Sequence, residues 1–166
     1  MMTQEFNHQE AIKRAVLMER DLMEFYQRAA QITTDPGGRK VFDILAQEER
    51  EHAGALFGIY PGSEFGSFDE FINAPSRSNS VMMHQLEKLI AGQVDERHAM
   101  EIALREEESL EKSLRYTVSM LVDPASRMVF ERMARETHDH YLIIESEYAR
   151  LMGMVHETDM ETYVRE

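Results

Sequence analysis

The second half of this chain repeats the first at a constant offset of 88 positions, with no gap. The departure that matters most for chemistry is at Glu49, which corresponds to Thr137. The residues of the first half that recur unchanged are Ala11, Ala15, Glu19, Leu22, Asp35, Pro36, Arg39, Val41, Phe42, Ala46, Glu48 and His52. Such a repeat predicts two similar structural units, each carrying acids and a histidine in the same register.

Apolar residues at spacings of three and four predict four long helices, at about 9–32, 36–58, 95–122 and 124–152. The second and fourth each open with an Asp-Pro pair, an N-cap acid followed by a proline whose missing N–H does no harm at the first helical position. Only a very short link precedes each Asp-Pro dipeptide. The first and second helices are therefore expected to be antiparallel, and so are the third and fourth.

The segment 59–94 differs, because it holds Pro61, Pro75, two glycines and several serines. We expect it to cross between the two helix pairs, with a short helix at about 81–91. Two antiparallel helical hairpins joined by one long crossover form the ferritin-like type of four-helix bundle. The sequence therefore predicts an all-α chain, folded as a single domain over 1–166.

Composition excludes several classes of function. The chain has no cysteine, so it forms no disulfide, thiolate metal site or rubredoxin-type centre. A net charge of −13 argues against binding nucleic acid or an anionic membrane surface. No apolar run approaches a membrane span and the first residues lack the apolar core of a signal peptide, so we expect a cytoplasmic protein.

Five acids and histidines fall on the apolar faces of the predicted helices: Glu19, Glu49, His52, Glu107 and His140. Carboxylates inside a helix bundle are costly unless they are paired or bound to a cation. A Glu and a His three residues apart on a helix can reach one metal ion, and three glutamates with two histidines suit two ions. Imidazole and carboxylate together favour iron, manganese or zinc.

Thr137 removes one carboxylate from this pattern, which would weaken one metal position. Glu136 and Glu111 are candidates to replace it, although Glu136 is better placed outside the ligand set, because its counterpart Glu48 stands beside an intact Glu49. Tyr26 is a candidate hydrogen-bond donor to a ligand or an ordinary core tyrosine. His138 projects to the opposite side from His140 and is expected to face solvent.

Together these motifs resemble the rubrerythrin family of the ferritin-like superfamily. The resemblance rests on Ala15, Glu19 and Tyr26, on the run Glu49-Arg50-Glu51-His52-Ala53, and on the run 99–105 leading to Glu107. It implies a non-haem di-iron centre that reduces hydrogen peroxide or oxidises ferrous iron in defence against oxidative stress. Full-length relatives carry a cysteine-ligated rubredoxin domain, so this chain would need a separate electron-donor protein.

Two other interpretations remain open. In the first, the chain is a metal-binding protein with little turnover. In the second, it is a metal-free helical scaffold with a degenerate site. Nothing in the sequence points to a hydroxylase acting on a larger substrate. A homodimer is the default expectation for such a protein.

Overall fold

The structure, a computed structural model, describes residues 5–77 and 80–153, and all regular secondary structure within them is helical. This confirms the predicted all-α class. The elements are α1 (His8–Ile32), α2 (Pro36–Ile59), α3 (Phe68–Asn73), α4 (Val81–Ile90), α5 (Glu96–Met120) and α6 (Pro124–Leu151). No helix in this part of the chain is both long and apolar enough to cross a membrane.

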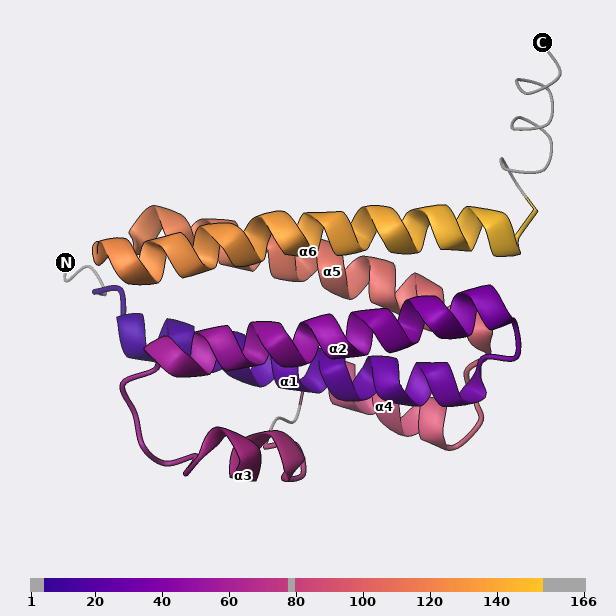
Figure 1. The fold of residues 1–166 in the computed structure, drawn as a ribbon, viewed down its shortest axis with the longest axis horizontal. Helices are drawn as coiled ribbons and strands as arrows, with labels where there is room; N and C mark the ends of the chain where they lie inside the picture. Colours follow the sequence, from indigo (N-terminus) through magenta and orange to yellow (C-terminus); the bar gives the residue numbers. More distant parts are fainter. Residues whose placement is uncertain (1–4, 78–79, 154–166) are drawn as a thin grey trace, which may run out of the picture.

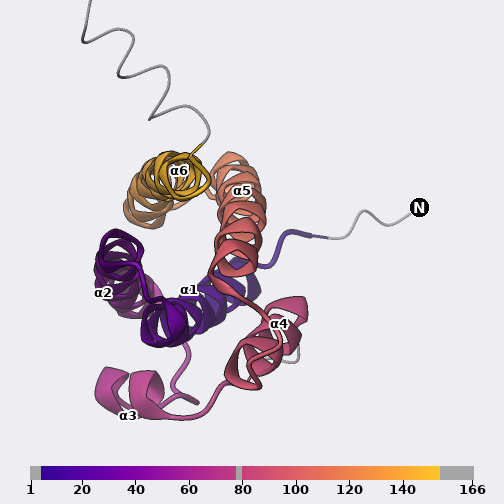
Figure 2. The ribbon, with the colours of Figure 1, turned by 90° about the vertical axis from the view of Figure 1, so that its right-hand side faces the viewer.

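The four long helices lie lengthwise beside one another (Figure 1). Seen end-on, α1, α2, α6 and α5 surround a common centre, while α3 lies outside them against α2 and α4 lies outside them against α1 and α5 (Figure 2). The closest neighbours are α1 with α2 and α5 with α6, and α2 also packs on α6. Residues from all four long helices can therefore meet at the centre.

The local signals at the hairpins explain this arrangement. Asp35 and Asp123 cap α2 and α6 by accepting hydrogen bonds from the backbone N–H groups of Gly38 and Ser126, and a proline follows each cap. The links are only three residues long, so each helix must turn back along the one before it. Arg150, near the end of α6, also forms an ion pair with Asp35, which joins the two hairpins at one end.

The crossover contains one helix that the sequence pattern did not predict. This is α3, which begins with a capping box in which Ser67 and Glu70 each accept a backbone N–H of the other. Its length of six residues is too short to show a helical period. The other crossover helix, α4, lies where a short helix was predicted, whereas α5 ends at Met120 rather than near 122.

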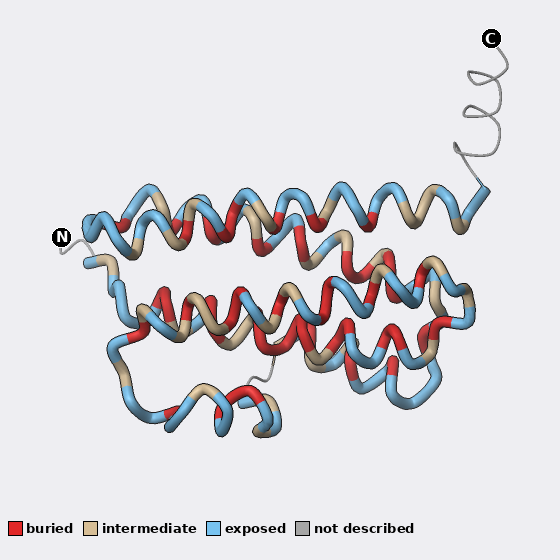
Figure 3. The backbone as a smooth tube through the Cα atoms, viewed as in Figure 1, coloured by how far each residue is buried: buried red, intermediate tan, exposed pale blue. Residues whose placement is uncertain are grey.

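The core follows the sides of the long helices that face one another (Figure 3). Its largest fully buried side chains include Phe25, Tyr26, Phe42 and Phe130. Buried polar residues gather within this apolar core at mid-helix, and they include Glu19, Glu49, His52, Glu107, Thr137 and His140. Such a cluster needs a physical reason, because unpaired buried charges are strongly destabilising.

Candidate metal centre

The four long helices bring all five predicted ligand residues into the core. Glu19 comes from α1, Glu49 and His52 from α2, Glu107 from α5 and His140 from α6, and none is more than 2% exposed. Glu49, His52 and His140 each offer one ligand atom within 4.8 Å of the others. These three residues form a group that can hold a metal ion.

Glu49 lies between the two histidines. Its Oε1 atom is 2.7 Å from Nδ1 of His140, and its Oε2 atom is 3.7 Å from Nδ1 of His52. Each carboxylate oxygen therefore faces a different imidazole, which is the geometry of a carboxylate able to bridge two ions.

The other two glutamates flank this arrangement, one on each side. Oε2 of Glu19 is 3.7 Å from Nδ1 of His52, and Oε1 of Glu107 is 3.5 Å from Nδ1 of His140. The cluster thus consists of two half-sites that share Glu49. One half-site adds Glu19 and His52, and the other adds Glu107 and His140.

The outer nitrogens of both histidines contact glutamates. Nε2 of His52 lies 3.0 Å from Glu136, and Nε2 of His140 lies 3.4 Å from Glu48. Histidines that bind metals generally donate their second ring N–H to a carboxylate, which fixes the tautomer. With Nε2 held in this way, Nδ1 of each ring is free to bind a cation at the centre.

Glu48 recurs at the 88-residue offset but was not among the site residues predicted from the sequence. The 88-residue offset contains the signal, since it aligns Glu48 with Glu136 just as it aligns the two histidines. Neither glutamate was identifiable as a histidine partner until the structure placed each on the opposite helix.

Tyr26 and Thr137 complete the buried polar cluster. The Tyr26 hydroxyl donates a hydrogen bond to Oε1 of Glu107 over 2.5 Å. Burial and the charge of Glu107 raise the pKa of Tyr26 well above its usual value, so this hydroxyl stays protonated. Oγ1 of Thr137 is buried and has no hydrogen-bond partner.

Neither candidate replacement for the missing carboxylate lies at the centre. Glu111 pairs with Arg115 and with the half-exposed His138 instead. Glu136 lies against the outer nitrogen of His52, on the side of the ring away from Nδ1. The structure therefore leaves three central carboxylates, with Thr137 in the fourth position.

Several polar atoms of the cluster are buried without hydrogen-bond partners. They are both carboxylate oxygens of Glu19 and of Glu49, Oε2 of Glu107 and Nδ1 of His52 and His140. Buried polar atoms are rarely left unsatisfied in folded proteins. Every one of these atoms is a common metal ligand, so the donor set fits divalent cations.

Without metal, protons take the place of the cations. Burial alone would lower the histidine pKa values, but Glu19 and Glu49 raise the pKa of His52 to about 11. Glu107 and Glu49 likewise raise the pKa of His140 to about 12. Burial and the charge of Glu49 raise the pKa of Glu19 well above its usual value. The site thus attracts positive charge in whichever form it is supplied.

Burial also favours the neutral form of Glu49. Its contacts with Glu19 and the two histidines outweigh that effect and lower its pKa. Glu49 therefore stays ionised more readily than Glu19.

The site defines a helical protein with a buried cluster of carboxylates and histidines that can hold a metal ion. A family model described as Rubrerythrin matches residues 1–60. The match covers α1 and α2 with Glu19, Glu49 and His52, and it confirms the resemblance to the rubrerythrin family. No curated protein and no solved structure shows significant similarity to the chain.

Proposed function

We propose that the chain is a ferritin-like four-helix bundle that holds two iron ions and uses them to reduce hydrogen peroxide or to oxidise ferrous iron. The observation that carries this proposal is the convergence of three buried carboxylates and two imidazole nitrogens whose facing atoms contact one another but have no hydrogen-bond partner. Two hairpins joined by a long crossover support the ferritin-like assignment. Carboxylate and imidazole ligands also accept manganese or zinc, but iron supplies redox chemistry.

The residues have distinct roles in this proposal. Glu49 would bridge the two ions, because its oxygens face different histidines. Glu19 with His52 and Glu107 with His140 would each complete one position. Tyr26 fixes the orientation of Glu107, and Glu136 and Glu48 fix the tautomers of the histidines.

Two ferrous ions bound here would supply the two electrons that, with two protons, convert one peroxide molecule to two waters. The protein contributes the geometry of the ligands, and the hydrophobic core around them limits the access of water. These 166 residues hold no cysteine, and we propose that the electrons that restore the ferrous state come from a separate donor protein. We further expect a homodimer in the cytoplasm.

Thr137 favours a second candidate function, metal binding with little turnover. Three carboxylates carry three negative charges against the four positive charges of two divalent ions. The second ion is then held less tightly, and a protein with one occupied position lacks the second electron for peroxide reduction.

Anaerobic reconstitution with ferrous iron tests both candidates. We expect the protein to bind close to two irons per chain. Peroxide should then produce a near-ultraviolet absorption band, and the bound iron should consume peroxide faster than free ferrous iron does. Iron uptake with no faster loss of peroxide than free iron gives would favour the second candidate. Iron well below one per chain, together with a melting temperature that chelators do not change, would support a metal-free scaffold instead.

The matched control for this experiment is Glu108→Gln. Glu108 is exposed on α5 and pairs with Lys112, so its substitution removes one carboxylate without touching the cluster. It should leave iron uptake unchanged.

A further inference from the structure

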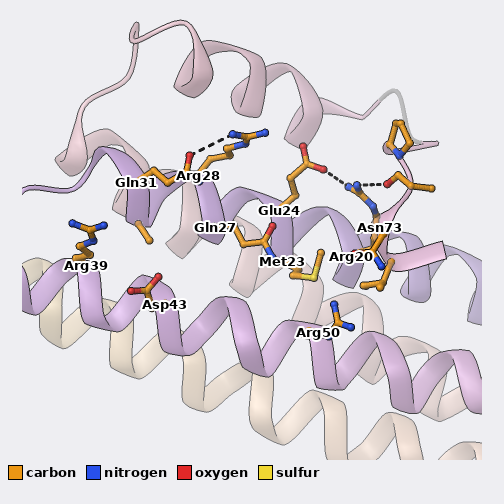
Figure 4. A pocket seen from close by; sticks show the side chains of 14 residues that line it. Arg20, Met23, Glu24, Gln27, Arg28, Gln31, Arg39, Asp43, Arg50 and Asn73 are labelled. Carbon is orange, nitrogen blue, oxygen red and sulfur yellow. Dashed lines mark hydrogen bonds and ion pairs between the residues drawn. The ribbon is translucent and has the colours of Figure 1, made fainter. Parts of the chain in front are cut away.

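A groove of about 640 Å³ lies on the outer side of the α1–α2 hairpin. The segment at the end of α3, including Ile72 and Asn73, closes one side of it (Figure 4). The residues of α1 and α2 that line the groove do not include the cluster of glutamates and histidines. The groove is therefore a separate site.

The groove is positively charged on a strongly acidic protein. Four arginines and two carboxylates line it, although the chain as a whole carries a net charge of −13. Arg20 pairs with Glu24 at 2.6 Å and with Asp21 at 3.4 Å, and it donates to the carbonyl oxygen of Ala74, but its buried Nε has no hydrogen-bond partner. The remaining arginines of the groove are Arg28, Arg39 and Arg50.

These three arginines carry charge that the protein does not neutralise. Arg28 bonds only the neutral side chain of Gln31, and Arg50 lies over the ring of Phe68. Within residues 5–77 and 80–153, no carboxylate forms an ion pair with any of the three. Arg39 is solvent-exposed, so its guanidinium is accessible to a ligand.

The positive charges occur at two ends of the groove. Arg28 and Arg39 each lie about one helical turn from the short link between α1 and α2. Arg50 lies eleven residues beyond Arg39 along α2, which corresponds to about 16 Å at the α-helical rise. Figure 4 shows Arg39 and Arg50 well apart on the same helix.

The segment between these ends does not favour negative charge. It contains the carboxylates of Glu24 and Asp43, the neutral Gln27, and the buried apolar side chains of Met23 and Ile72. A ligand with negative charge along its whole length would meet these acids.

We propose that this groove binds an elongated small molecule with an anionic group at each end and an uncharged middle. Guanidinium groups bind carboxylates and phosphates through paired hydrogen bonds, so either group fits the two ends. A small single anion would reach only one end.

Calorimetric titration of the full chain at low ionic strength tests the proposal. The probes are sebacate, a long dicarboxylate, and decane-1,10-diyl bisphosphate, its counterpart with phosphate ends. Succinate is too short to reach both ends, and decanoate has only one charged end. At least one long probe should bind about tenfold more tightly than either comparison compound, and the tighter of the two identifies the end group.

Variants then locate the binding. Arg39→Gln should weaken the tighter probe about tenfold, since it removes a charged hydrogen-bond donor from an exposed position. The matched control is Arg127→Gln on α6, an exposed arginine that pairs with Glu131 and does not line the groove. Equal binding of the long and short probes, no binding of either long probe, or equal loss in both variants would overturn the proposal.

Discussion

The two hairpins, α1–α2 and α5–α6, share one sequence pattern but do not supply the same side chains to the cluster. Glu19 and Glu107 match, as do His52 and His140, and each pair occupies equivalent places in the cluster. Glu49, however, corresponds to Thr137. The one carboxylate of the cluster that faces both histidines therefore comes from the first hairpin.

A second difference concerns the hydrogen bonds to the flanking glutamates. Tyr26 of the first hairpin donates to Glu107 of the second, whereas the residue equivalent to Tyr26 is Leu114, which has no hydroxyl. Accordingly, both oxygens of Glu19 lack partners, but only one oxygen of Glu107 does. The two half-sites therefore differ in the hydrogen bonds to their flanking glutamates, and Glu19 is the less supported carboxylate.

Removing the shared carboxylate should have the largest effect. Glu49→Gln keeps the shape of the side chain but removes the only charge that faces both histidines. We expect the affinity for ferrous iron to fall at least about 100-fold, beyond the usual cost of losing an outer hydrogen-bond partner. Equilibrium titration under anaerobic conditions measures this, and a loss no larger than that of Glu108→Gln would show that Glu49 binds no metal.

Alkaline pH should destabilise the metal-free protein. The pKa values of His52 and His140, about 11 and about 12, lie above the ordinary histidine value of 6.5, so the folded state holds protons that the unfolded state releases. Their stabilising contribution is complete below about pH 6.5 and is lost progressively as the pH rises toward the folded pKa values. The raised pKa of Glu19 acts in the same direction.

We expect the free energy of unfolding to fall by at least about 2 kcal/mol between pH 7.5 and pH 9. Urea unfolding at several pH values measures it. Bound metal needs unprotonated imidazoles, so metal affinity should rise over the same range. A metal-free protein whose stability does not change in this range would contradict the proposed charge state of the cluster.

Restoring the symmetry should strengthen metal binding and weaken the metal-free fold. Thr137→Glu supplies the carboxylate that the repeat lacks, and it balances the charge of two divalent ions. We expect the second metal to bind about tenfold more tightly, while the added buried acid lowers the melting temperature of the metal-free protein. Thr137→Gln, with similar volume and no charge, is the control, and an equal gain in both variants would assign the effect to size alone.

The sequence was sufficient for the helical class and for the inward placement of Glu19, Glu49 and Glu107, because the long helices show their period over many turns. It was not sufficient for α3, whose six residues are held by a capping box and the packing of Phe71 and Ile72. The match to residues 1–60 likewise covers only the first hairpin.

The side-chain contacts between helices also could not be predicted from the sequence. The partners of Tyr26, Glu136 and Glu111 depend on which helices are neighbours and how far each is rotated, and neither quantity is encoded in the spacing along one helix. The groove with Arg28 and Arg39 was missed for the same reason, since its charges lie on two helices and look like ordinary solvated residues in each.

The smallest expected effect concerns the outer glutamates. Glu136→Gln and Glu48→Gln each remove the charge beside one imidazole Nε2, but both side chains are more than a third exposed and water can take their place. We therefore expect a loss of metal affinity of only about threefold, below the usual range for buried outer partners.

The two outer glutamates differ in their contacts. Glu136 makes the shorter contact with its histidine, 3.0 Å against 3.4 Å for Glu48, but it also pairs with Arg132, which partly neutralises its charge. If the shorter contact dominates, Glu136→Gln lowers the metal affinity more than Glu48→Gln does. Arg132 then acts only through Glu136, so the double variant Arg132→Gln with Glu136→Gln should lose no more metal affinity than Glu136→Gln alone. A larger loss for Glu48→Gln, measured by the same iron titration, would instead mark the His140 half-site as the one that depends more on its outer partner.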